Sequence, residues 1–220
     1  MIPVKSRLAR WLTVVLGICL TACTSNGPQR RAVVMLLDTS GTYTQELDKA
    51  RAIINYLLGT LQSGEAFAVA RIDSASFNEK DIIARATFSD KPSAANAQKR
   101  AFQHLTNQFI ETVSGSAHTD ITGGILQATE FLRESGANQR YIVIFSDLAE
   151  DLLKGQVRDF ALPLEGVEVI AVNVTKLRSD NVDPREFLQR VETWDSRVTA
   201  NGGRWRVVND LERLDKMLQG

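Results

Sequence analysis

AVVMLLDTSGT, residues 32–42, is the stretch of sequence that decides the fold. Its first six residues are all apolar, which is typical of a β-strand buried on both faces, as strands of parallel sheets are. The apolar run stops at Asp38, and Ser40 and Thr42 follow at intervals of two residues. Three oxygen-bearing side chains therefore come directly after a predicted core strand.

Strands and helices alternate along the rest of the chain. The pattern predicts strands at 32–37, 66–72, 81–88, 141–147, 167–174 and 204–208, and helices at 45–61, 93–113, 122–135, 184–198 and 209–219. This order predicts an α/β fold with a Rossmann-like, doubly wound, mostly parallel sheet. The strand at 81–88 follows its neighbour after a short turn, so we expect it to be an antiparallel edge strand. Such sheets bind ligands beyond the carboxyl ends of their strands, and Asp38 lies at such an end.

The first residues have the features of an export signal. Lys5, Arg7 and Arg10 precede the apolar run 11–20, which is too short to span a bilayer. The sequence LTAC, residues 20–23, resembles the lipobox of bacterial lipoproteins, which implies a signal peptide at 1–22 and a lipid on Cys23. An ordinary secretory signal or an uncleaved anchor are the alternatives. Residues 23–31 would then be a short tether, and 32–220 the domain.

Composition narrows the classes of function. The 26 basic and 26 acidic residues of the chain become 23 and 26 without residues 1–22, a net charge of −3. No basic run stands out, which argues against nucleic acid as a partner. Both cysteines, Cys19 and Cys23, precede the predicted domain. A domain of this length can bury an adequate core without disulfides.

Three polar clusters are predicted at the carboxyl edge of the sheet. The first is Asp38, Ser40 and Thr42, the second contains Thr119, and the third is Asp147 at the end of YIVIFSD. Any one cluster has a simpler explanation, because Ser, Thr and Asp are common in turns and helix caps. Their convergence on one edge favours a binding site.

In these clusters the chain resembles the von Willebrand factor A domains. DTSGT is similar to their DxSxS motif, HTDITGG to the loop that carries their single Thr, and VIFSD to the strand that ends in their last Asp. The resemblance extends over residues 32–219. It implies a metal-ion-dependent adhesion site with these five ligand residues: Asp38, Ser40, Thr42, Thr119 and Asp147.

The chemistry of this set suits Mg²⁺ or Mn²⁺, because carboxylates and hydroxyls are hard oxygen ligands. Two carboxylates, Asp38 and Asp147, only offset the charge of a divalent ion. An ion held in this way would keep water ligands, one of which an acidic side chain of a protein partner could replace. The pattern therefore predicts binding rather than catalysis.

Two positions depart from the family pattern. Thr42 stands where the motif has Ser, and its methyl group needs space. Leu148 follows Asp147 where the family usually has Gly, and Glu150 and Asp151 come next. These two carboxylates could tune the metal, repel an acidic partner or cap a helix, and we favour capping. Asp120 is interpreted as a loop or cap residue, and His118 as a solvated or packed loop residue.

Enzyme signatures are missing from the sequence. It has no GxSxG elbow, no GxGxxG after the first strand and no P-loop. We therefore expect no enzymatic activity. We expect instead that the protein is a lipid-anchored binding module of the cell envelope. The alternatives are a metal-free assembly scaffold of the same fold and a metal-dependent hydrolase. Thr24, which follows the lipobox Cys, implies the outer membrane in a diderm host.

Replacing Cys23 by Ser should release the protein from membranes, because no lipid can then be attached. Cys19→Ser is the matched control and should stay in the membrane fraction. Fractionation of cells that express each variant measures the outcome. Membrane retention of Cys23→Ser would show an uncleaved anchor instead.

Overall fold

A computed structural model describes residues 29–41, 43, 46–177 and 179–219. It contains a six-stranded sheet in the order β3-β2-β1-β4-β5-β6. Neighbouring strands are parallel except β2 and β3, so the predicted antiparallel edge strand is confirmed. The strands are β1 (Arg31–Asp38), β2 (Ala66–Ile72), β3 (Ile82–Thr87), β4 (Gln139–Phe145), β5 (Val167–Val172) and β6 (Arg204–Val208).

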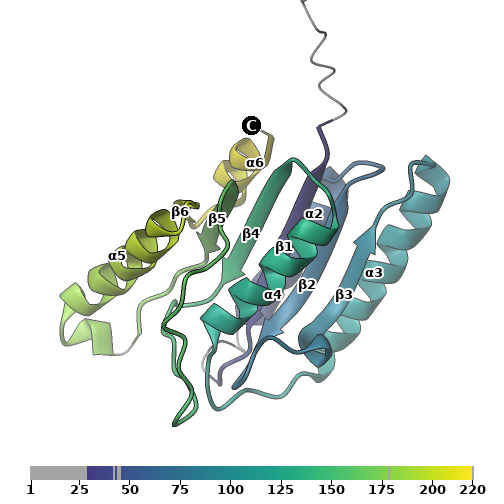
Figure 1. Ribbon diagram of the computed structural model, residues 1–220. Helices are drawn as coiled ribbons and strands as arrows, with labels where there is room; N and C mark the ends of the chain where they lie inside the picture. The colour runs from purple at the N-terminus through teal and green to yellow at the C-terminus, as the bar shows by residue number, and fades with distance from the viewer. Residues whose placement is uncertain (1–28, 42, 44–45, 178, 220) are drawn as a thin grey trace, which may run out of the picture.

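Helices cover both faces of the sheet, as expected for a doubly wound fold (Figure 1). The helices α2, α3 and α6 pack on one face, and α4 and α5 pack on the other. Their bounds are α2 (Leu47–Thr60), α3 (Pro92–Thr112), α4 (Ile121–Glu134), α5 (Pro184–Ala200) and α6 (Leu211–Gln219). Two short 3₁₀ helices, η2 (Glu79–Asp81) and η3 (Ser179–Asn181), lie in connections.

The apolar run that opens the domain is the centre of the core. In β1, Val33, Met35 and Leu37 face the α2 side, and Val34 and Leu36 face the α4 side. A strand with both faces covered must be apolar throughout, which explains the unbroken run in the sequence. Both halves of the core come from residues 32–218. We therefore expect residues 24–220 to fold without the preceding segment.

The connection from β4 to β5 is unusual, because parallel strands are most often joined through a helix. Residues 146–166 contain none. Instead, Leu148, Leu162 and Leu164 are buried against the core on the α4 and α5 face. We call residues 146–166 the crossover. It extends beyond the carboxyl edge of the sheet (Figure 1).

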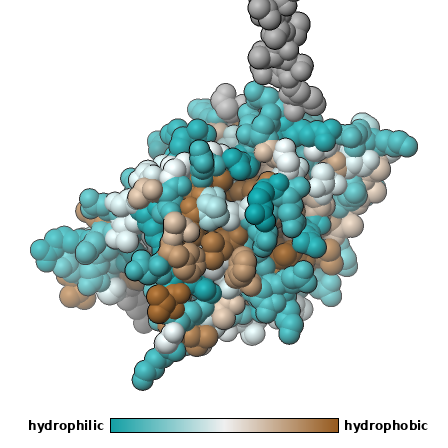
Figure 2. Space-filling model, in the orientation of Figure 1, coloured by the Kyte–Doolittle hydropathy of each residue, from teal (hydrophilic) through white to brown (hydrophobic). Residues whose placement is uncertain are grey.

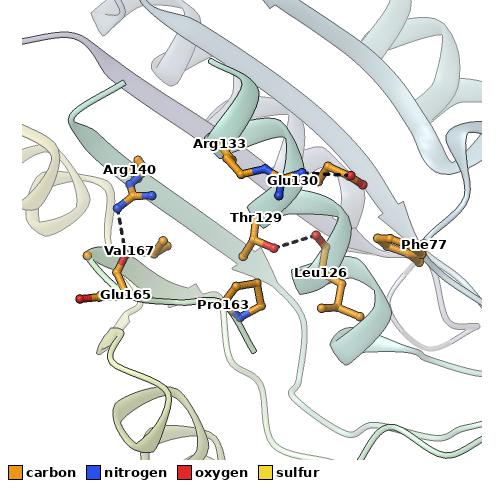
Figure 3. Close-up of a pocket in the computed structure, with 10 residues that line it drawn as sticks. Phe77, Leu126, Thr129, Glu130, Arg133, Arg140, Pro163, Glu165 and Val167 are labelled. Carbon is orange, nitrogen blue, oxygen red and sulfur yellow. Dashed lines mark hydrogen bonds and ion pairs between the residues drawn. The ribbon is translucent and has the colours of Figure 1, made fainter. Parts of the chain in front are cut away.

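A groove of about 700 Å³ lies between α4 and the crossover. Leu126 of α4, Pro163 of the crossover and Phe77 from the connection after β2 line it (Figure 3). Hydrophobic residues gather in the middle of this face, with hydrophilic residues around them (Figure 2). The groove thus lies beside the helix-free crossover.

The structure adds detail to the helix predicted at 184–198. In α5, Trp194 and Val198 are buried, but Leu188 is 65% exposed. Asp183 caps this helix, and the helix begins at Pro184, the predicted first residue. Residues 1–28, which include Cys23 and most of the predicted tether, lie outside the described residues. Within the described residues, no helix is long and apolar enough to cross a membrane.

Leu164→Ala should lower the free energy of unfolding by about 2–5 kcal/mol, because it opens a cavity in the core under the crossover. Leu153→Ala, in the same connection but 40% exposed, should change it by less than about 0.5 kcal/mol. Urea unfolding of both variants measures the difference. Equal losses of unfolding free energy in the two variants would show that Leu164 of the crossover does not contribute to this face of the core.

Candidate functional site

The strand order places a crevice between β1 and β4. From β1 the chain builds outward through β2 and β3, and it then returns to the other side of β1 to form β4. The connections after β1 and β4 therefore leave the sheet in opposite directions. Ligands bind at the carboxyl ends of strands beside such a switch point. Leu37 pairs with Phe145 across this junction, so the next residues on the two strands, Asp38 and Ser146, are neighbours.

Asp38 is fully buried at this crevice. Its Oδ1 accepts a hydrogen bond from the backbone N–H of Ser40 at 2.8 Å, and its Oδ2 accepts one from the hydroxyl of Ser146 at 2.6 Å. The hydroxyl of Thr39 donates to the carbonyl of Ile72 at 3.0 Å, which ties the loop to the end of β2. The Asp38 carboxylate is thus held by its own loop and by the residue that follows β4.

The loop that precedes α4 is bonded to the loop after β1. The N–H of Ser116 donates to the carbonyl of Thr39 at 2.7 Å, and its hydroxyl donates to Asp73 at 2.5 Å. Three residues later, Thr119 and Asp151 exchange two backbone hydrogen bonds of 2.8 and 2.9 Å. Thr119 is therefore fixed between the loops that follow β2 and β4.

Asp147 is 4% exposed and ends the third cluster. Its Oδ1 accepts a hydrogen bond from the N–H of Ala149 at 2.9 Å. Burial raises the pKa of Asp147, and the negative charge of Asp38 raises it further. The hydrogen bond from Ala149 and the positive charge of Arg190 act in the opposite direction. The crevice therefore contains two buried carboxylates that repel each other.

This arrangement fits a divalent cation, because a positive ion would relieve the repulsion between the two carboxylates. The structure brings the loops of Asp38, Ser40, Thr119 and Asp147 together. Thr42, the remaining predicted ligand, lies outside the described residues. Within those described residues, no three His, Cys, Asp or Glu side chains form a group that could hold a metal ion. A metal here would have to depend on hydroxyl ligands as well as the two carboxylates.

Leu148 takes a backbone conformation that favours glycine, the residue the related motif has at this position. Its φ is 66°, in the left-handed region, which is strained for a side chain such as Leu. Burial of the side chain and one hydrogen bond hold Leu148 in this conformation. The Leu148 side chain is 1% exposed, and its carbonyl accepts a hydrogen bond from the indole N–H of Trp194 at 3.1 Å. The loop after Asp147 thus keeps the glycine geometry without the glycine.

The two carboxylates after Leu148 have other partners. Glu150 accepts a hydrogen bond from the N–H of Thr122 at 2.7 Å, which caps the first turn of α4, as the capping interpretation predicts. Arg197 lies 3.4 Å from its other oxygen. Asp151 lies 2.9 Å from the Nδ1 atom of His118, and 66% of its side chain is exposed. Of the two, Asp151 is therefore the more exposed, since only 18% of the Glu150 side chain is exposed.

Asp120 is a structural residue, as the sequence interpretation predicts. It caps α4 by accepting a hydrogen bond from the N–H of Gly123 at 2.8 Å, and it forms a buried ion pair with Arg158 at 2.7 Å. A Cβ at position 123 would lie 2.5 Å from the Asp120 carboxylate, so glycine is required there. This cap fixes the backbone next to Thr119.

Three residues of this junction escaped the sequence analysis. Ser146 and Asp73 follow the ends of β4 and β2, and Ser116 precedes Thr119 by three positions. Ser146 could have been predicted from the sequence, because it stands between a predicted core strand and a predicted ligand. Asp73 and Ser116 gave no signal, since their contact depends on loops 43 residues apart in the sequence.

Comparison with known proteins supports the fold. No protein-family model matches the sequence, and no curated protein matches it. A pilus adhesin, SpaC from Lactobacillus rhamnosus GG, is structurally similar with a TM-score of 0.54 at 11% identity, over 87% of this chain and 29% of that one. A von Willebrand factor type A protein from Catenulispora acidiphila has a TM-score of 0.50 at 13% identity, over 87% and 41%. The chain thus spans less than half of each protein, and its fold is that of the von Willebrand factor A domain.

Asp147→Asn should stabilise the metal-free protein at neutral pH. Because burial raises the folded-state pKa of Asp147 above its unfolded value, this carboxyl group costs stability increasingly as the pH rises above the unfolded-state pKa, and the full cost is reached once the pH exceeds the folded-state pKa. Asn removes the charge and can still accept the hydrogen bond from Ala149. The gain should shrink as the pH falls toward about 3.9, where the unfolded-state carboxyl is also half protonated.

Urea unfolding in a metal chelator, at several pH values, measures this gain. Asp195→Asn, on the exposed surface of α5, is the matched control and should show no such pH-dependent gain. A loss of stability in Asp147→Asn at neutral pH would mean that the carboxylate is already compensated within the protein.

Proposed function

We propose that this domain is a lipid-anchored binding module of the bacterial cell envelope, which recognises an acidic side chain of a protein partner through Mg²⁺ or Mn²⁺ at the β1–β4 crevice. The observation that carries the proposal is the pair of buried carboxylates, Asp38 and Asp147, held beside the Ser40 loop. A buried negative pair is costly unless a positive charge accompanies it. A cation in the crevice would supply that charge.

Each proposed ligand has a defined part. Asp38 and Asp147 supply charge equal and opposite to that of the ion, and Ser40, Thr42 and Thr119 supply neutral oxygens. The bound ion would offer a partner carboxylate a positively charged position in place of water. The backbone hydrogen bonds to Asp38 and Asp147 hold both carboxylates in place before any partner arrives. This preorganisation favours binding.

Exposed apolar side chains near the same edge favour a protein as the partner. Leu153 and Val157, 40% and 72% exposed, flank the turn at Gly155 in the crossover. Val182, 88% exposed, lies in the connection after β5. Apolar contacts around a charged centre are typical of protein interfaces. The fold is shared with a pilus adhesin, which agrees with an adhesive role.

Titration with Mg²⁺ and Mn²⁺ should raise the melting temperature of residues 24–220. At a free ion concentration 100 times the dissociation constant, the stabilisation should be about 2.7 kcal/mol. Asp38→Ala should abolish this ion-induced shift, whatever its own starting stability. Asp48→Ala, whose wild-type side chain is 90% exposed on α2, should keep the full shift.

No shift with either ion would contradict the metal site and favour the metal-free scaffold. Binding of a captured partner that survives chelator would point the same way. A metal-dependent hydrolase would instead need phosphoester turnover that disappears in Asp147→Ala.

A further inference from the structure

A second groove, at the end of the sheet opposite the crevice, carries five positively charged side chains. It has a volume of about 810 Å³ and lies along α6 and the first residues of β4, β5 and β6. We call it the basic groove, and its cations are Arg140, Arg204, Arg206, Arg213 and Lys216. These residues are scattered over 77 positions, so no basic run appears in the sequence.

One carboxylate lines this groove, and it is already neutralised. Glu168 of β5 is 6% exposed, and its two oxygens accept hydrogen bonds from Arg204 at 2.9 Å and from Arg206 at 2.8 Å. Five cations against one carboxylate give the lining a formal charge of +4. Residues 23–220 together carry −3. The positive charge is therefore concentrated locally on a chain that is negative as a whole.

The cations of the basic groove remain accessible to a ligand. The side chains of Arg204, Arg206 and Arg213 are 68%, 51% and 75% exposed. Arg213 also forms an ion pair with Asp210 at 3.3 Å, but this pair lies on the exposed surface, where water and an incoming anion compete with it. Arg140 is held by a hydrogen bond to the carbonyl of Glu165 at 2.9 Å. A Cβ at position 166 would lie 2.9 Å from its guanidinium, so Gly166 provides the space in which Arg140 lies. Guanidinium groups present planar sets of donors that suit phosphate oxygens.

The basic groove lies at the edge where the domain would meet its anchor. The chain enters β1 at Arg31 and leaves α6 at the same edge (Figure 1). Cys23 precedes Arg31 by eight residues, which span at most about 29 Å when extended. A lipid on Cys23 would therefore keep this edge close to the membrane surface. Salt screens the attraction between the groove's cations and an anionic membrane beyond a Debye length of about 8 Å. The groove must therefore lie close to the membrane surface for this attraction to contribute.

We propose that the basic groove binds the phosphate headgroups of anionic phospholipids in the membrane that anchors the protein. This inference rests on the proposed lipid anchor, and it adds how the anchored domain is oriented on the membrane. β1 has eight residues and is about 26 Å long. With the basic groove on the membrane, Asp38 and the metal crevice lie at the far end and face away from it, toward a partner.

The test uses residues 24–220, without lipid and in a metal chelator, so failure of the anchor or of the metal site cannot affect it. Sedimentation with phosphatidylcholine vesicles, with and without phosphatidylglycerol, measures binding. We expect binding to the anionic vesicles alone and its loss at high salt. Since the protein is negative overall, such binding must come from a local positive surface.

Paired variants locate that surface. Arg213→Gln with Lys216→Gln removes two cations of α6 and leaves the buried Glu168 pairs intact. Each lost cation should weaken binding about fivefold, and both together roughly 25-fold. Lys80→Gln with Lys154→Gln removes the same charge from exposed positions in the connections after β2 and β4, and should bind like the wild type. Melting curves verify that both double variants are folded.

Three results would overturn the proposal: no binding to anionic vesicles, equal loss in the two double variants, or equal binding to neutral vesicles. Competition by millimolar inorganic phosphate at constant ionic strength is a further arm. If it abolishes vesicle binding, the groove is a site for a free anion and not a membrane surface.

Discussion

The pairing of β1 with β4 forces two carboxylates into one buried crevice, and the surrounding loops are arranged around that constraint. Asp38 is fixed by hydrogen bonds from Ser40 and Ser146. Asp147 is fixed by Ala149, and burial together with the charge of Asp38 raises its pKa. Such a pair is unfavourable by itself. The backbone of Leu148, the residue after Asp147, is also unfavourable by itself. Packing in the core and the hydrogen bond from Trp194 hold it in a left-handed conformation that a leucine would otherwise avoid.

The two ends of the sheet differ in charge and in chemistry. At the carboxyl ends the crevice contains carboxylates and hydroxyls, and exposed apolar side chains lie in the nearby connections. At the amino ends the basic groove contains five cations. In a tethered protein this polarity has a consequence, because one end can face an anionic surface while the other stays available. The helix-free crossover, which extends beyond the carboxyl edge (Figure 1), contributes the exposed side chains of Leu153 and Val157 to this arrangement.

Most of the fold was predictable from the sequence, because strands covered on both faces need unbroken apolar runs such as 32–37. The antiparallel strand β3 followed from its short turn. That Asp38 and Asp147 lie at one edge of the sheet was predictable, because each stands at or just after the end of a predicted core strand. Contacts between distant loops were not predictable, for example the one between Ser116 and Asp73. The exposure of Leu188 could not be predicted, because helical spacing does not show how wide the buried face of α5 is. The basic groove was missed because strand pairing assembles it from separate segments.

Anomalous diffraction from crystals grown with Mn²⁺ tests the central claim most directly, because it locates the ion independently of stability. The account predicts a manganese peak in the β1–β4 crevice, in contact with the Ser40 hydroxyl and next to Asp38 and Asp147, and no such peak in crystals of Asp38→Ala. A crevice without manganese in the wild type, or a peak only at surface carboxylates, would contradict it.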